Sequence, residues 1–248
     1  TPALGAGRPS SILGSPNGFI PDLVWNHGIR RNTHYFFMRK EVFLKDEYYH
    51  IYNRGVDKRV IFCDEKERAR FVNTLYVLNN FQDIPANFDV VALHPRDALI
   101  PREPMVDVAA ACLMPNHYHM VIRALSDSAI SKFLHKIGVS YTMYFNKRHE
   151  RSGALFESSF KAKHIDRGEY ATYLTQYIHF NPYSLFQTKS GIKLSDLVSY
   201  PWSTLNDYMG GKSRFAHVVN CDFRDTILGM NAEEYGKYCM EAFNDFEK

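Results

Sequence analysis

The chain has 248 residues, 45% of them hydrophobic, so it is long enough for one domain with a full core and is neither disordered nor fibrous. Its 30 Lys and Arg residues against 27 Asp and Glu residues give a formal charge of +3, so global charge alone does not indicate a nucleic-acid partner. The four cysteines are widely spaced and no apolar run reaches about 18 residues, which argues against a disulfide framework, a membrane span and secretion.

The N-terminal segment 1–37 is rich in Gly, Pro, Ser and Asn and shows no sustained hydrophobic period. It precedes Met38-Arg39-Lys40-Glu41, which resembles an ordinary bacterial protein start. We expect residues 1–37 to be a disordered leader, expression-derived or translated from upstream sequence, with a functional N-terminal arm as the alternative. Residues 38–210 are expected to form the main domain and residues 211–248 a C-terminal helical extension.

The first part of the main domain is predicted to contain two strands and a helix. Aromatic and β-branched residues alternate over 48–53, which indicates a strand, and Asn53-Arg54-Gly55 is expected to form the turn that ends it. Asp64 is the expected N-cap of an amphipathic helix. A further strand is predicted at 88–93, followed by a Pro-punctuated loop at 95–104.

The most informative local feature is His117-Tyr118-His119, within the extended apolar segment 110–123. Side chains alternate along a strand, so His117 and His119 project from one face, where two imidazoles can bind one metal ion. A pair of histidines on a solvent-facing strand is the ordinary alternative. The continuous apolar character of the segment predicts a central strand that is covered on both faces.

Two helices are predicted after this strand. Ser126 or Ser128 is the expected N-cap of the first, and an extended piece at 154–165 follows it. Asp166 is the expected N-cap of the second helix, which Pro182 ends. The order of elements indicates an α+β domain, an antiparallel β-sheet flanked by helices.

Basic residues concentrate between positions 131 and 164. Seven Lys and Arg residues there stand against two Glu residues, a local balance of 7 − 2 = +5, and aromatic residues are interleaved with them. Such a stretch favours contacts with phosphate groups, and a solvated helix face is the alternative. The candidate DNA-binding lysines are Lys132, Lys136, Lys161 and Lys163.

Tyr177 and Asn181 are four residues apart on the second helix and therefore share one of its faces. A phenol and a carboxamide oxygen can approach one point from that face. Two imidazoles and one Asn oxygen make an open site suited to Mg²⁺ or Mn²⁺. The ordinary roles of these residues are a core tyrosine and a helix C-cap.

Four sequence blocks in this order resemble the single-tyrosine HUH transposases, which include the transposases of small bacterial insertion sequences and the REP-associated tyrosine transposases. The resemblance covers about 48–209 and implies an HUH endonuclease fold of the ferredoxin or RRM-like type. The blocks are Tyr49-His50-Ile51-Tyr52-Asn53-Arg54-Gly55, Cys112-Leu113-Met114-Pro115-Asn116-His117-Tyr118-His119, Arg151-Ser152-Gly153-Ala154-Leu155-Phe156 with Phe160-Lys161, and Tyr177-Ile178-His179-Phe180-Asn181-Pro182.

The resemblance implies that Tyr177 is the nucleophile, that His117 and His119 bind a divalent metal ion, Mg²⁺ or Mn²⁺, and that Asn181 is the third ligand. It also implies that Tyr177 attacks a phosphodiester of single-stranded DNA beside a hairpin, which leaves a 5′-phosphotyrosine and a free 3′-hydroxyl. The chain departs from its relatives at Ser159, where they commonly carry Arg. A phosphate contact is therefore in doubt there.

Two other functions stay open. The Tyr173 to Tyr177 spacing matches two-tyrosine replication initiators and relaxases, which are also HUH nickases. A domesticated protein that binds a DNA or RNA hairpin without cleaving it is the alternative from another class. Arg54 is a candidate DNA contact, with a surface Arg beside a turn as its alternative. Relatives act as dimers or monomers, so a homodimer stays open, and we expect a bacterial, cytoplasmic, nucleoid-associated protein.

Overall fold

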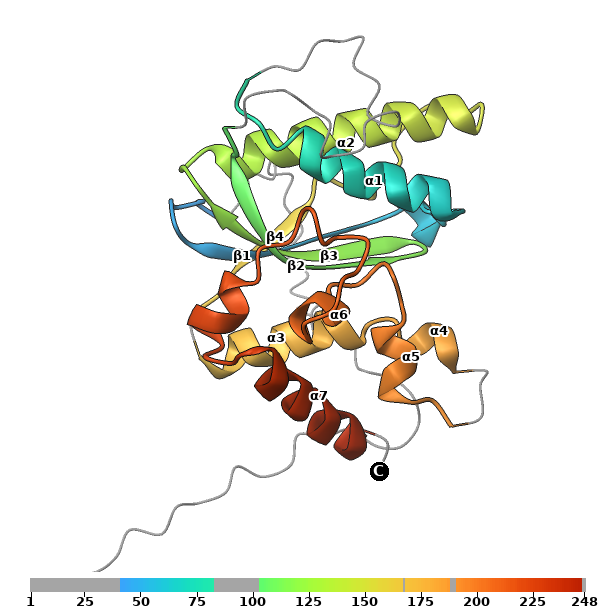
Figure 1. Cartoon of the computed structure of the whole chain (residues 1–248). Coiled ribbons are helices and arrows are strands. Elements are labelled where there is room, and N and C mark those ends of the chain that lie inside the picture. The colour runs from blue at the N-terminus through green and yellow to red at the C-terminus, as the bar shows by residue number, and fades with distance from the viewer. Residues whose placement is uncertain (1–40, 83–102, 167, 188–190, 247–248) are drawn as a thin grey trace, which may run out of the picture.

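A computed structural model describes residues 41–82, 103–166, 168–187 and 191–246 (Figure 1). The expected leader 1–37, the strand predicted at 88–93 and most of the loop predicted at 95–104 lie outside these residues.

A four-stranded antiparallel sheet lies at the centre of the structure, with the strand order β2-β3-β1-β4. Helices pack on both of its faces, which confirms the predicted α+β fold with an antiparallel sheet (Figure 1). The strands are β1 (Tyr48–Arg54), β2 (Val106–Met114), β3 (His117–Ala124) and β4 (Lys161–His164).

The apolar segment 110–123 forms a hairpin, so the prediction of a single strand was wrong. β2 ends at Met114 and β3 begins at His117, and Pro115 and Asn116 form the turn. The Pro115 carbonyl accepts hydrogen bonds from the backbone N–H groups of Ile61 and Phe62 at 2.8 and 3.0 Å. Because both strands are buried, the apolar pattern runs through the turn without a break. The expected central position of the histidine strand is confirmed, since β3 lies between β2 and β1.

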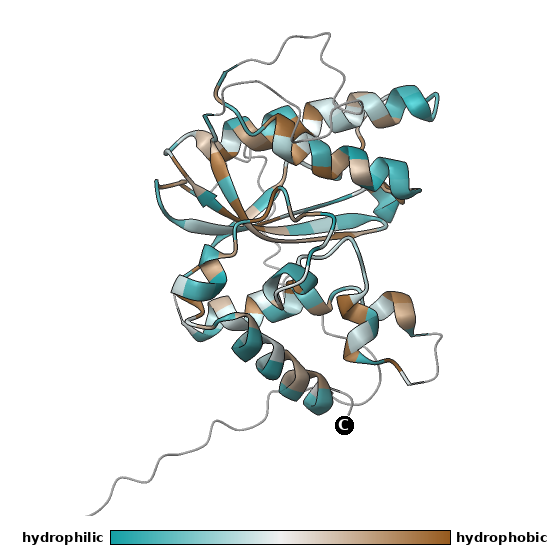
Figure 2. Cartoon of the chain, in the orientation of Figure 1, coloured by the Kyte–Doolittle hydropathy of each residue, from teal (hydrophilic) through white to brown (hydrophobic). Residues whose placement is uncertain are grey.

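Two layers of helices enclose the sheet. α1 (Glu65–Val77) and α2 (Ala129–Arg148) lie on one face, whereas α3 (Glu169–Phe180) and α7 (Ala232–Phe246) lie on the other side (Figure 1). Figure 2 shows hydrophobic residues along the central strands and hydrophilic residues at the free end of α2 and along α7. The shorter helices are η1 (Val56–Lys58), α4 (Tyr183–Phe186), α5 (Leu194–Val198), α6 (Leu205–Tyr208) and η2 (Phe223–Ile227).

The sheet separates two hydrophobic cores because side chains alternate along each strand. Ile51 and Tyr118 point to the α1 and α2 side, whereas Cys112 and Val121 point to the α3 and α7 side. The C-terminal helix α7 contributes Tyr235 to the second core, with its hydroxyl 2.8 Å from Nδ1 of a histidine on α3. None of the helices that the structure describes is long and apolar enough to cross a membrane.

Helix ends agree with the sequence where a side chain caps them. Asp64 is the N-cap of α1 and accepts a hydrogen bond from the Glu67 N–H at 2.9 Å, as predicted. Ser128 stands at the N-cap of α2, but its side chain makes no cap hydrogen bond. The N-cap of α3 is Gly168, with φ of 113°, so the prediction of Asp166 was wrong. A φ in this range strains residues with a Cβ, so glycine takes the position at which the chain turns into the helix.

Candidate metal and nucleophile site

His117 and His119 lie on the face of β3 that is turned to α3. Tyr118 lies between them and points to the opposite face, where its ring packs 5.2 Å from that of Phe71 and 6.0 Å from that of Phe156. Tyr118 is buried, so its packing holds this part of β3 in register. The burial of the middle residue therefore directs both imidazoles to the other side of the sheet.

The helix α3 brings Tyr177 and Asn181 to the same place. Asn181 Oδ1 lies 3.1 Å from Nε2 of His117. The rings of Tyr177 and His119 meet edge to face, with centroids 5.4 Å apart and planes at 86°. The strand and the helix thus meet, and all four predicted site residues lie together within one chain. Tyr177 and Asn181 are half-buried, and Asn181 follows the last residue of α3 as its C-cap.

The hydrogen bonds of His117 indicate where its proton lies. Its Nδ1 is 2.6 Å from Asn116 Oδ1, and Asn116 donates from its own amide nitrogen to the Lys58 carbonyl at 3.2 Å. The Asn116 oxygen must therefore accept, and a neutral imidazole that donates from Nδ1 carries a lone pair on Nε2. That lone pair faces Asn181 Oδ1, which is also an acceptor. Two acceptors at this distance suit a shared cation.

His119 contacts a third histidine, His50 of β1, which sequence reasoning did not assign. His50 Nε2 lies 2.9 Å from His119 Nδ1, and both side chains are buried. Burial lowers the pKa of His50 to about 3. Burial also lowers the pKa of His119, and the nearby His50 and His117 lower it further. Both rings are therefore neutral near pH 7, which is the form that binds metal. Only the register of β1 and β3 brings them together, so no local sequence signal marks the pair.

The candidate DNA-binding residues divide between the two faces of the sheet. Arg54 is the register partner of His117, and Lys161 is the partner of Tyr52. Directly opposed residues of antiparallel strands share a face. Arg54, Lys161 and also Lys163, two residues further along β4, therefore start from the face that carries the histidines. The Nζ of Lys163 lies 4.3 Å from the centroid of the Tyr170 ring.

Lys132 and Lys136 lie on α2, on the opposite side of the sheet. Lys136 donates from Nζ to the Asn80 carbonyl at 3.0 Å, and Lys132 Nζ lies 5.7 Å from the centroid of the Phe81 ring. The fold does not bring these two lysines to the histidine site. Ser159, where relatives commonly carry Arg, is exposed in the segment that leads into β4.

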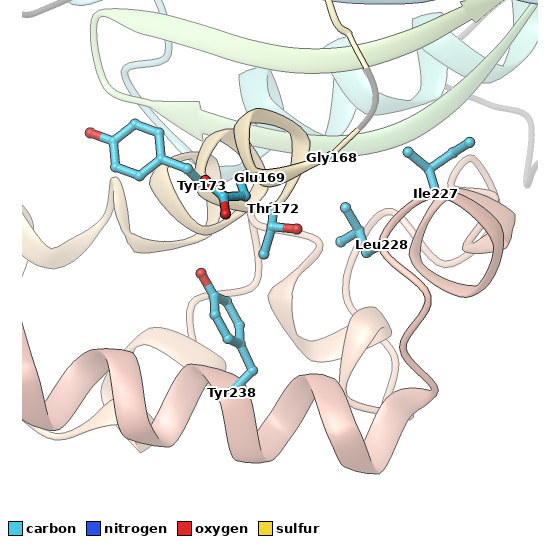
Figure 3. A pocket seen from close by; sticks show the side chains of 7 residues that line it. All are labelled: Gly168, Glu169, Thr172, Tyr173, Ile227, Leu228 and Tyr238. Atoms are coloured by element: carbon cyan, nitrogen blue, oxygen red, sulfur yellow. The ribbon is translucent and has the colours of Figure 1, made fainter. Parts of the chain in front are cut away.

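Tyr173 and Tyr177 differ in their surroundings. Tyr173 is 56% exposed and borders an open pocket of about 400 Å³ between the start of α3, η2 and α7, whereas Tyr177 lies against His119. Figure 3 shows Thr172 and Leu228 turned into this pocket and the Tyr238 side chain reaching towards α3 from α7. The residues that line the pocket include none of the four predicted site residues, so the pocket is not the site.

A second cluster that contains potential metal ligands lies on the α1 and α2 side. Cys63, Glu67 and His149 place one ligand atom each within 4.8 Å of one another. Both Glu67 oxygens are already engaged, one by the Cys63 N–H at 2.6 Å and the other by His149 Nε2 at 2.6 Å. Arg148 Nε is also 3.5 Å from this carboxylate. The Arg148 guanidinium offsets the negative charge of the buried Glu67 carboxylate. These contacts form a structural network that accounts for the cluster.

The segment that holds the four site residues matches a known family. Residues 100–181 match the family model described as "Transposase IS200 like". This segment is similar to the IS200-like transposases. The match confirms the family resemblance and supports a transposase function for the chain.

A solved "Structure of the REP associates tyrosine transposase bound to a REP hairpin" has 13% sequence identity and a TM-score of 0.45, over 71% of this chain and 86% of that chain. No curated protein matches the chain. Within the IS200-like segment, the whole of α2 and the whole of β4 lie between the histidines of β3 and the Tyr and Asn at the end of α3, and the fold brings them together.

Proposed function

We propose that this IS200-like protein is a transposase that nicks and rejoins single-stranded DNA beside hairpins, with Tyr177 as the nucleophile and Mg²⁺ or Mn²⁺ as the cofactor. One observation carries the proposal: Tyr177 on α3 and Asn181 at its C-cap, four residues apart, lie against His119 and His117. A nucleophile next to a cluster of neutral nitrogen and oxygen donors is the arrangement that metal-assisted phosphodiester cleavage requires.

The donor set fits a hard or borderline divalent cation. His117 Nε2 and Asn181 Oδ1 face each other as two acceptors, and His119 would supply the third donor from the same face of β3. These three residues would leave coordination positions open for phosphate oxygens. When bound, the ion polarises the scissile phosphate and neutralises charge on the leaving 3′-oxygen.

Tyr177 would supply the bond-forming atom. A tyrosine has a reference pKa of about 10, so the phenol must lose its proton to a base or to water as it reacts. Its oxygen then forms a bond to phosphorus while the bond from phosphorus to the 3′-oxygen breaks. The products are a 5′-phosphotyrosine and a free 3′-hydroxyl. Attack by a 3′-hydroxyl on this ester reverses the step and rejoins a strand without ATP.

The residues around the site favour a nucleic-acid strand as the substrate. Arg54, Lys161 and Lys163 start from the same face of the sheet as the histidines and can contact phosphates. The Tyr52 and Tyr170 rings lie beside these lysines and can stack on bases. A hairpin as the recognised element follows from the family resemblance.

The site can be completed by one chain, because Tyr177 and both histidines come from the same molecule. A monomer that acts in cis fits this arrangement, and a homodimer that exchanges α3 is the alternative. Equal mixtures of a Tyr177→Phe chain and a His117→Ala chain separate the two. If the mixture captures DNA covalently although each variant alone does not, α3 is exchanged between chains. If the mixture also fails to capture DNA, the site is formed in cis.

The proposal is tested with end-labelled hairpin oligonucleotides that carry single-stranded flanks, incubated with the full chain and Mg²⁺ or Mn²⁺. We expect a covalent protein–DNA adduct on a denaturing gel, and none after EDTA. DNA binding without an adduct, with both metals and several hairpins, would contradict cleavage and favour the domesticated binding protein.

A further inference from the structure

One buried histidine has no role in the proposed chemistry. His50 of β1 is fully buried, yet it is not among the three donors of the proposed metal site. Its Nε2 lies 2.9 Å from His119 Nδ1, and its Nδ1 has no hydrogen-bond partner among the residues that the structure describes. A buried imidazole nitrogen without a partner is unfavourable, so the position of this ring calls for a physical reason.

The single hydrogen bond between the two rings links their tautomers. Between two neutral imidazoles, one nitrogen of the contact carries the proton and the other must accept it. If His50 donates from its Nε2, then His119 accepts on Nδ1 and holds its own proton on Nε2. The Nε2 of His119 then has no lone pair with which to bind a cation. If His119 donates from Nδ1, then its Nε2 carries the lone pair that a metal needs.

The second arrangement has a direct parallel in His117. There Nδ1 lies 2.6 Å from the Asn116 oxygen, which leaves the lone pair on Nε2 directed to Asn181. Metal-binding histidines generally donate their other N–H to an acceptor that fixes the tautomer and the ring orientation. His50 is the group that stands in this position for His119.

We propose that His50 is a positioning residue that accepts a hydrogen bond from His119 Nδ1 and thereby presents the Nε2 lone pair of His119 to the metal. The inference rests on the proposed metal site. In this arrangement His50 carries its one proton on Nδ1, the nitrogen that has no hydrogen-bond partner among the described residues. Tyr52 supports the ring of His50 from one side, with centroids 4.8 Å apart and planes at 28°.

Two variants of His50 distinguish a role in positioning the His119 ring from a role in core packing alone. His50→Leu fills the space with an apolar side chain and removes the acceptor, whereas His50→Gln restores an acceptor oxygen on a side chain of suitable length. His164→Leu is a matched control, because this histidine lies on the neighbouring strand β4 and pairs with Glu47 and Asp166 at 3.0 and 3.1 Å. Thermal unfolding without metal identifies any variant that has lost its fold.

The first measurement is the affinity of the full chain for Mn²⁺ by isothermal titration calorimetry. We expect His50→Leu to bind Mn²⁺ about 10–100-fold more weakly than the wild type, and His50→Gln to stay within about threefold, as does His164→Leu. The inference is overturned if His50→Leu retains wild-type affinity, or if His50→Gln binds as weakly as His50→Leu.

The second measurement does not depend on metal. Long-range ¹⁵N–¹H spectra of the metal-free protein report which nitrogen of His119 carries the proton. We expect Nδ1–H in the wild type and in His50→Gln, and a shift to Nε2–H in His50→Leu. An Nε2–H tautomer in the wild type would overturn the inference. A wild-type chain with the Nδ1–H tautomer that binds neither Mn²⁺ nor Mg²⁺ would instead overturn the proposed metal-dependent function, so the two failures are distinct.

Discussion

Asn181 Oδ1 and His117 Nε2 lie 3.1 Å apart although 64 positions separate the two residues in the chain. The contact joins the end of α3 to the start of β3 and, when His117 is neutral with its proton on Nδ1, places two acceptors against each other. It supports the proposed cation site, with Asn181 as one of the ligands.

Replacing Asn181 by Leu should weaken Mn²⁺ binding by about tenfold or more, because the substitution removes one of the three proposed protein donors. Asn181→Asp should bind at least as well as the wild type, since a carboxylate is a stronger ligand for a hard cation. Calorimetric titration measures both affinities. Asn146→Leu is the control, because Asn146 lies on α2 and donates to the Gly153 carbonyl. Equal affinity of Asn181→Leu and wild type would remove Asn181 from the ligand set.

Replacing Tyr177 by Phe should abolish the covalent adduct with hairpin DNA while it leaves DNA binding nearly unchanged. The substitution removes only the attacking oxygen, and the ring can keep its edge-to-face contact with His119. Tyr173→Phe is the matched control and should retain the adduct, because Tyr173 is exposed at the pocket between α3 and α7. Capture that survives in Tyr177→Phe and disappears in Tyr173→Phe would favour a mechanism like that of the two-tyrosine nickases.

The double substitution of Lys161 and Lys163 by Gln should weaken binding of single-stranded DNA and reduce its dependence on salt. Removing one lysine–phosphate interaction lowers the slope of log K against log salt by about 0.7 for single strands, so removing two lowers it by about 1.4. Fluorescence anisotropy at several salt concentrations measures the slope. Lys132 and Lys136, replaced together by Gln, provide the control on the opposite face of the sheet. A larger loss of affinity in this control than in the β4 variant would place the DNA path along α2.

Replacing Asp64 by Ala should lower the free energy of unfolding by about 1 kcal/mol, because the substitution removes the N-cap hydrogen bond to the Glu67 N–H together with the partly exposed ion pair to Arg148. Ser128→Ala is the matched control at the start of α2, where the serine side chain makes no cap hydrogen bond, and its effect should be within about 0.5 kcal/mol. Urea denaturation followed by circular dichroism measures both. Equal destabilisation of the two variants would show that the cap at Asp64 does not stabilise α1.

Much of the site could be predicted because its residues obey local periodicity. Alternation along a strand places His117 and His119 on one face, and the four-residue spacing places Tyr177 and Asn181 on one helix face. These rules need only the identity of the element. The hairpin at Pro115 was missed because two buried strands joined by a short turn read as one apolar run.

His50 could not be found in this way because its partner is 69 positions away. The contact depends on the register between β1 and β3, in which Tyr52 stands opposite His119 and His50 lies diagonally beside it. The division of the lysines has the same origin. Lys136 and Lys161 belong to one basic stretch in the sequence, yet α2 and β4 carry them to different sides of the sheet.

Local sequence was sufficient to predict the α+β class, the shared face of the two histidines, and the shared face of Tyr177 and Asn181, because strand and helix periods depend on the local backbone alone. Three contacts could be seen only in the folded chain: His117 meets Asn181, His50 contacts His119, and Tyr177 rather than Tyr173 lies at the histidines. Those contacts depend on strand register and on the packing of α3 against the sheet. Both are set by burial of the whole core and by no single segment.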